Sequence, residues 1–282
     1  MTKQAPAQVT YDDFYEDLLA IATIQDTLNK SMAGPDWMER AGRFIEDDNV
    51  PEDVIPLDYR AAILDETISE LVKCSYNYEW WKPLSELDMS NAGVELVDIL
   101  HFATSMELAS EFQFKNRELE DNVRDVPAEF LETPHTYVAF SAAWAASFIA
   151  NSNEINYSRR GFRSYVNSLI SGVTTHEFSW NDYWGLCASL GFSPSAIIER
   201  YIFKASLNLF RTLNGYREKK YVKRWFVPMN SGGIQEIEDN DVMLAYCDDF
   251  KAETGRFPKH REIMEFLRNT YAEYKTNPVA TA

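Results

Sequence analysis

The chain has 282 residues, of which 45% are hydrophobic and 14% aromatic, a composition typical of a folded globular protein with a substantial core. Its formal net charge of −17 argues against a nucleic-acid polymer as partner, because binding to a phosphate backbone requires a basic surface. No apolar run approaches the roughly 18 residues that a membrane helix needs, so no membrane partner is predicted. Three widely spaced cysteines and no signal peptide indicate a cytoplasmic protein.

Helical periodicity dominates the first half of the chain. Apolar residues at steps of three and four predict a helix over residues 11–32, which the segment AGPDW then ends. A second helix is predicted from residue 58 and ends at Pro83 at the latest, and a third is predicted over residues 91–107. Residues 121–135 have the composition of a loop.

The second half is also predicted to be helical. We expect helices within residues 136–150, 175–192 and 193–216, the last with Ser193 as N-cap and Pro194 in its first turn. No stretch shows sustained strand alternation, so an all-α fold is predicted. We expect one domain over residues 1–247 and, after a link rich in Gly, Asn and Asp, a helical appendage over residues 248–282.

Two pairs of acidic residues at helical spacing stand in apolar surroundings. Glu66 and Glu70 are four apart, Glu95 and Asp98 are three apart, and each pair shares a helix face. Like charges placed in this way repel by about 0.2–0.5 kcal/mol. A solvated acidic face is the simplest alternative. Two antiparallel helices would instead bring the four carboxylates together as an oxygen site suited to Mg²⁺.

These acids and the residues between them resemble a known family. The stretch ETISELVKCSYNYEWWK…NAGVELVDILHF is similar to the all-α NTP pyrophosphohydrolases of the MazG type, and most of all to the dimeric dUTPases. Those enzymes have a Glu pair before an E-x-x-D motif, with S-[aromatic]-x-[aromatic]-x-x-W-K between them. Their first pair is usually three residues apart, whereas here it is four. The resemblance covers residues 20–110 and 200–240, and it leaves about 112–200 as a poorly matched insertion.

The resemblance implies a four-helix-bundle-type core with additional helices, and it assigns roles to the acids. Glu66, Glu70, Glu95 and Asp98 would be the metal ligands for two or more Mg²⁺ ions. Glu66 would also be the catalytic base that takes a proton from the attacking water.

The family supplies a Gln and an Asn to the uracil edge, and in the segment IQDTLN these are Gln25 and Asn29. They lie one helical turn apart, and an amide can donate and accept together. Without the resemblance, two plain surface amides are the simpler interpretation. The resemblance also places Trp81 beside the nucleoside and Lys82 near the phosphates, although the tryptophans could be core.

A later segment resembles the family's phosphate-binding region. Three of its residues recur at helical steps of four and three and form one polar stripe, for which a solvated basic face is the alternative. Lys219 stands at a turn position where the family prefers Gly. The residues carried over as phosphate contacts are Lys204, Asn208, Arg211, Tyr216, Tyr221, Lys223 and Asn240.

The predicted function is Mg²⁺-dependent hydrolysis of dUTP to dUMP and pyrophosphate by a homodimer. Because amides can rotate, hydrolysis of dCTP or of both nucleotides is the alternative within the same chemistry. A further alternative is a nucleotide-sensing or protein-binding module on the same fold without catalysis. The divergent middle and tail suggest a phage-like member, whose location would be the host cytoplasm.

Overall fold

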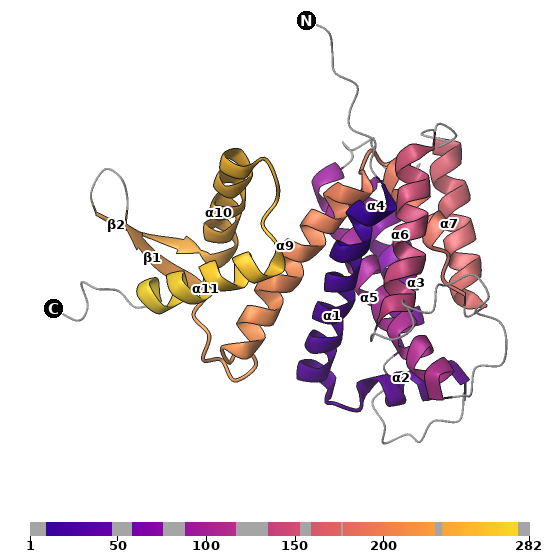
Figure 1. Cartoon of the computed structure of the whole chain (residues 1–282), viewed down its shortest axis with the longest axis horizontal. Helices are drawn as coiled ribbons and strands as arrows, with labels where there is room; N and C mark the ends of the chain where they lie inside the picture. Colours follow the sequence, from indigo (N-terminus) through magenta and orange to yellow (C-terminus); the bar gives the residue numbers. More distant parts are fainter. Residues whose placement is uncertain are drawn as a thin grey trace, which may run out of the picture. The chain divides into compact units, whose positions relative to one another are not determined.

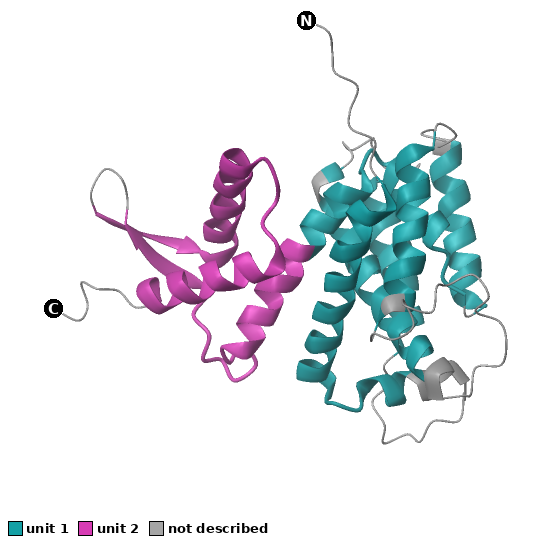
Figure 2. Cartoon of the chain, viewed as in Figure 1, with its two compact units in different colours: residues 1–201 teal, residues 202–282 magenta. Residues whose placement is uncertain are grey.

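The computed structural model describes residues 10–46, 58–75, 88–116, 135–152, 159–175, 177–228 and 233–275 (Figure 1). The chain forms two compact units, residues 1–201 and residues 202–282 (Figure 2). Each unit is described by itself below. None of the helices in the described ranges is both long and apolar enough to cross a lipid bilayer.

The first unit consists of helices. Its elements are α1 (Tyr11–Ala33), α2 (Trp37–Glu46), α3 (Tyr59–Asp65), the π-helix η1 (Glu66–Leu71), α4 (Val72–Ser75), α5 (Met89–Asn116), α6 (Thr136–Asn151), α7 (Arg159–Thr174), α8 (Trp180–Ser189) and the first part of α9 (Pro194–Leu213). The prediction of an all-α fold is confirmed.

Helix α5 is the central helix of this unit. It packs against α1, α2, α3, η1, α4 and α6. Residues on several sides of α5 are therefore buried, among them Leu96, Val97 and Ile99. A helix surrounded in this way carries its few polar side chains into the interior. This explains why Glu95 is only 8% exposed.

Several predicted helix boundaries are confirmed. Helix α1 buries the predicted apolar face, which includes Phe14 and Leu28, and ends at Gly34, whose φ of 103° suits glycine. The Ser193 hydroxyl accepts a hydrogen bond from the backbone N–H of Ala196 at 3.2 Å, as an N-cap should at the start of α9. Helices α2 and α7 were not predicted. The predicted loop over residues 121–135 lies outside the described residues, apart from His135.

The second unit contains the rest of α9, an antiparallel hairpin of β1 (Arg224–Pro228) and β2 (Ile234–Glu238), and helices α10 (Asp239–Thr254) and α11 (His260–Tyr274). Its core joins Phe210, Tyr221, Trp225 and Tyr271, whose rings lie 5.0–6.0 Å apart in successive contacts. The hairpin was not predicted because only Trp225 among its ten residues is fully buried, so the strands show no clean alternation.

The expected boundary between residues 247 and 248 falls inside α10. Helix α10 continues across it because Met243 and Cys247, one turn apart, are buried on the same face. The compact second unit therefore begins well before the predicted appendage.

Candidate carboxylate and nucleotide site

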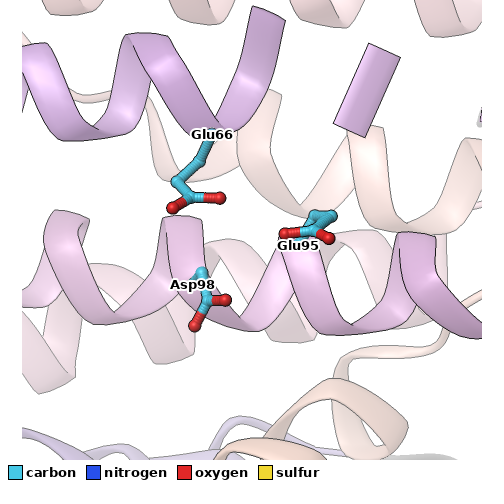
Figure 3. Close-up of side chains that lie close together, drawn as sticks. All are labelled: Glu66, Glu95 and Asp98. Atoms are coloured by element: carbon cyan, nitrogen blue, oxygen red, sulfur yellow. The ribbon is translucent and has the colours of Figure 1, made fainter. Parts of the chain in front are cut away.

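Three acidic side chains converge between η1 and α5. Glu66 is the first residue of η1, and Glu95 and Asp98 lie on the facing helix α5, as Figure 3 shows. One carboxylate oxygen from each of the three residues lies within 4.8 Å of the other two. The structure thus brings together three of the four predicted metal ligands.

The π-helix explains the unusual spacing of the first acid pair. Along residues 59–75, α3, η1 and α4 follow one another without a break, and the N–H of Val72 bonds to the carbonyl of Thr67, five residues earlier. A bond of this kind closes a wider turn, so the helix takes up one extra residue. The extra residue of the four-residue spacing is accommodated in the wider turn of η1, and α3 and α4 on either side of it both pack against α5.

Glu70 is exposed and stands outside the group of three. It is still close enough for its negative charge to contribute to the raised pKa of Glu95. Its role as a ligand stays a prediction.

The electrostatics of the cluster favour a cation. Burial, followed by the charges of Asp98 and Glu95, raises the pKa of Glu66 from 4.5 to about 7. Burial and the Asp98 charge also raise the pKa of Glu95, although the Asn91 amide opposes this by donating to Glu95 Oε1 at 2.8 Å. Repulsion between carboxylates so close together makes it energetically unfavourable for all of them to be ionised unless a positive charge lies nearby. Oxygen ligands of this number and charge could hold a divalent metal ion.

The two predicted base-reading amides are buried in a hydrogen-bonded network. Gln25 Nε2 donates to Asn29 Oδ1 at 3.0 Å, and Asn29 Nδ2 donates to Ser105 Oγ at 2.9 Å. Gln25 Oε1 accepts from the Tyr201 hydroxyl at 2.6 Å and lies 2.6 Å from His101 Nδ1. Gln25 and Asn29 are 5% and 7% exposed, so the alternative of plain surface amides is wrong.

Ser105, His101 and Tyr201 were not predicted to take part in this network. His101 follows Asp98 by three residues, so the amide network and the carboxylates occupy successive turns of α5. That spacing could have indicated His101 from the sequence. Tyr201 could not be found in this way, because it reaches Gln25 across 176 residues of chain.

Several predicted phosphate contacts surround a buried acid in the second unit. Arg211 donates from Nε and Nη2 to Asp239 at 2.8 and 2.7 Å, and the Tyr221 hydroxyl donates to Asp239 at 2.8 Å. Arg211 also donates to Asn240 Oδ1 at 3.2 Å. Burial and the Asp239 charge raise the pKa of Tyr221. Asp239 itself is fully buried and was not predicted.

The adjoining turn holds two more of these residues. The Lys223 ammonium lies 5.3 Å from the centre of the Tyr216 ring. Lys219 adopts a φ of 56°, a left-handed conformation that glycine takes more readily than other residues. Lys204 and Asn208 lie on α9, whereas Trp81 and Lys82 lie outside the described residues.

An all-α fold, a carboxylate cluster suited to a divalent cation and a buried amide pair on α1, bonded to the turn of α5 that follows the carboxylates, are the features of a nucleoside triphosphate pyrophosphohydrolase. The dUTPase family model matches residues 17–216, which is well over half of the chain. The chain therefore belongs to the all-α dimeric dUTPase family. The general activity of this family is the hydrolysis of dUTP. The match runs through residues 112–200, where the motifs alone gave no correspondence. No curated protein matches the chain.

Proposed function

We propose that the chain hydrolyses dUTP to dUMP and pyrophosphate with Mg²⁺ at Glu66, Glu95 and Asp98, and with Glu70 at the edge of the site. The observation that carries this proposal is the convergence of three carboxylates from two elements, with ligand oxygens within 4.8 Å. Such a donor set fits a hard, oxygen-preferring cation, and two or more ions are expected from the family. When bound, Mg²⁺ supplies positive charge to the phosphate oxygens and acidifies the attacking water.

Glu66 is proposed as the general base. Its pKa of about 7 applies to the cluster without a cation, and a bound Mg²⁺ would favour the ionised form of Glu66, which can accept a proton. Glu66 also projects from η1 toward the two acids on α5, as a base beside the reacting phosphate should. By analogy with the family, the water is proposed to attack the β-phosphorus.

We propose that cationic and polar side chains of the second unit bind the phosphates of the substrate. Lys204, Asn208 and Arg211 form a polar stripe on α9, and Lys223 lies beside Tyr216 in the following turn. Arg211, Tyr221 and Asn240 are proposed as further phosphate contacts, and their bonds around Asp239 would hold them in one place. Lys82 is proposed as a further contact and Trp81 as a neighbour of the nucleoside, by analogy with the family.

We propose that two copies of the chain associate through the outer face of α6. Tyr137, Ser141, Trp144 and Phe148 follow one another at steps of four, three and four and share this face. Trp144 is 63% and Phe148 59% exposed. Exposed aromatic side chains in a continuous row are typical of a protein interface.

The charge of the molecule favours a second copy as the occupant of this face. Helix α6 has no Asp, Glu, Lys or Arg, whereas the whole chain carries a net charge of −17. Two such chains repel one another, and an uncharged contact surface keeps this repulsion smaller than an acidic one would. Two antiparallel α6 helices related by a two-fold axis would place Trp144 of one copy on the small Ser141 of the other, and Tyr137 on Phe148.

The experiment that tests the function is pyrophosphate release from dUTP, dCTP, dTTP and dATP, with Mg²⁺ and with a chelator. The proposal expects release from dUTP that requires Mg²⁺. Faster release from dCTP would favour the dCTP alternative, and a rise in melting temperature without release would favour a nucleotide sensor. The cytoplasmic location and the phage-like origin stay predictions.

A further inference from the structure

We infer that Ser105 fixes the direction of the amide network around Gln25 and Asn29, and through it the choice of base. This inference rests on the proposed contact of these two amides with the nucleotide base. Ser105 does not itself touch the base in this scheme, so it is a positioning residue.

The direction of the network follows from the hydrogen of the Ser105 hydroxyl. Ser105 donates that hydrogen to the backbone carbonyl of His101 at 2.9 Å, so its oxygen can only accept from Asn29. Asn29 must then point Nδ2 toward Ser105 and Oδ1 toward Gln25. Gln25 in turn points Nε2 toward Asn29 and Oε1 toward His101 and Tyr201.

The other side chains that bond to this network cannot set its direction. A tyrosine hydroxyl donates or accepts by rotating its hydrogen, and a histidine Nδ1 donates or accepts according to its tautomer. Both Tyr201 and His101 would therefore serve the reversed network equally well. Tyr59 also hydrogen-bonds to Ser105, and its hydroxyl can likewise rotate its hydrogen, so the bond from Ser105 to the backbone of α5 is what distinguishes the two directions.

Reversing the network would exchange what Gln25 offers to a ligand. In the observed direction Oε1 accepts two bonds and Nε2 donates one, so one N–H remains for a base. In the reversed direction both N–H groups would be used and one carbonyl lone pair would remain. Gln25 is thus a donor toward the base in this structure, and would be an acceptor after reversal.

Uracil and cytosine differ in the same sense. Uracil accepts at position 4 and donates at N3, whereas cytosine donates at position 4 and accepts at N3. If the carboxylate cluster holds the phosphates, the base can enter the site in only one orientation. Gln25 then faces a fixed position of the base, where it can bond to uracil in one network direction and to cytosine in the other. Because dUTP hydrolysis is the activity of the family, the observed direction is assigned to uracil.

The test compares kcat/KM for dUTP and dCTP in the full chain and in three variants. Ser105→Ala removes the directing hydroxyl, and its ratio of dUTP to dCTP activity should fall by about fivefold to tenfold, the effect of one hydrogen bond. Ser105→Cys should give a similar fall while leaving no cavity at this buried position, which covers the case in which the alanine variant does not fold. Ser110→Ala is the matched control, because Ser110 makes the same bond to a backbone carbonyl of α5, that of Met106, outside the network.

The control should keep the wild-type ratio. Damage to the fold alone would lower both activities together and leave the ratio unchanged. An unchanged ratio in both Ser105 variants, with the wild-type chain active, would overturn this inference alone. A wild-type chain that hydrolyses neither nucleotide would overturn the proposed function, and this inference with it.

Discussion

Glu66 and Asp98 come from different elements, η1 and α5, and the charge of Asp98 is the largest electrostatic contribution, after burial, to the raised pKa of Glu66. The folded chain thus holds like charges together that the unfolded chain keeps apart. A protein keeps such a cluster at a cost in stability, and a cation that binds only the folded state offsets this cost.

Glu95→Ala should abolish catalysis while leaving the fold intact. The substitution removes a carboxylate from the cluster and relieves repulsion between like charges, so the metal-free protein should be at least as stable as the wild type. We expect pyrophosphate release to fall at least about a hundredfold. Release assays combined with thermal melting check both parts, with Asp248→Asn, an exposed acid on α10, as control. Retained turnover in the Glu95 variant would refute the metal site.

Without metal, the stability of the protein should depend on pH through Glu66. The folded pKa of about 7 lies above the unfolded value of 4.5, so the folded state binds this proton more tightly. The contribution is fully present below about pH 4.5 and is lost as pH rises through about 7. Melting curves recorded with a chelator between these pH values should show this loss in the wild type and a smaller one in Glu66→Gln. Identical pH profiles would contradict the raised pKa.

Deleting Ile68 should convert η1 into an ordinary α-helical turn. The π turn contains one surplus residue, and Ile68 is 49% exposed within it. The buried residues Ile63 and Leu71 should therefore keep their packing, and the acid pair would take the three-residue spacing usual in the family. We expect Mg²⁺-dependent activity within about tenfold of the wild type.

Deleting Ile68 and Ser69 together provides the control for this prediction. The π turn contains one extra residue, so deleting two residues removes one more than the turn can lose. This should rotate the preceding helix by about 100° relative to α5. This rotation should turn Glu66 away from the cluster and abolish activity. Equal activity in the single and double deletions would show that η1 is not a compensating turn.

Trp144→Asp should convert the proposed dimer into a monomer. The substitution places a negative charge at the centre of an uncharged interface on an already acidic chain, which adds repulsion and removes the largest apolar contact. Sedimentation at micromolar concentration measures the change. Leu244→Asp, at a 50% exposed position on α10, should leave the dimer intact. A wild-type chain that sediments as a monomer would contradict the proposal.

Asp239→Ala should destabilise the second unit strongly. Its carboxylate is fully buried and receives two bonds from Arg211 and one from Tyr221, so its removal leaves a partly buried guanidinium without its counter-charge. We expect the free energy of unfolding to fall by about 3 kcal/mol in urea titrations.

The exposed pair of Arg256 and Glu262 is the matched control for this prediction. Arg256 also donates two bonds to one carboxylate, from Nη1 and Nη2 at 2.8 and 2.7 Å, but this pair is much more exposed. Arg256→Ala should therefore have a much smaller effect, because water screens an exposed pair and Glu262 keeps its bond from the backbone N–H of Lys259 at the start of α11. Equal losses in the two variants would mean that burial does not determine the strength of the Asp239 pair.

The sequence by itself determined the helical class, the carboxylate residues and the amide pair. Helical periodicity and acid spacing are local properties, and a helix fixes which residues three or four apart share a face. Glu95 with Asp98, and Gln25 with Asn29, could be paired for that reason. The family could be recognised because the same short segments carry its motifs.

Only the tertiary structure decided how those segments act together. It showed that a π turn accommodates the extra residue after Glu66 and that Arg211 forms an ion pair with the buried Asp239. It also showed that Tyr201 donates a hydrogen bond to Gln25, which lies 176 residues earlier in the chain. The direction of the amide network likewise depends on Ser105, on a helix far from α1 in the sequence. Contacts of this kind arise from packing between elements, and a local pattern carries no information about which distant side chain will complete a hydrogen bond.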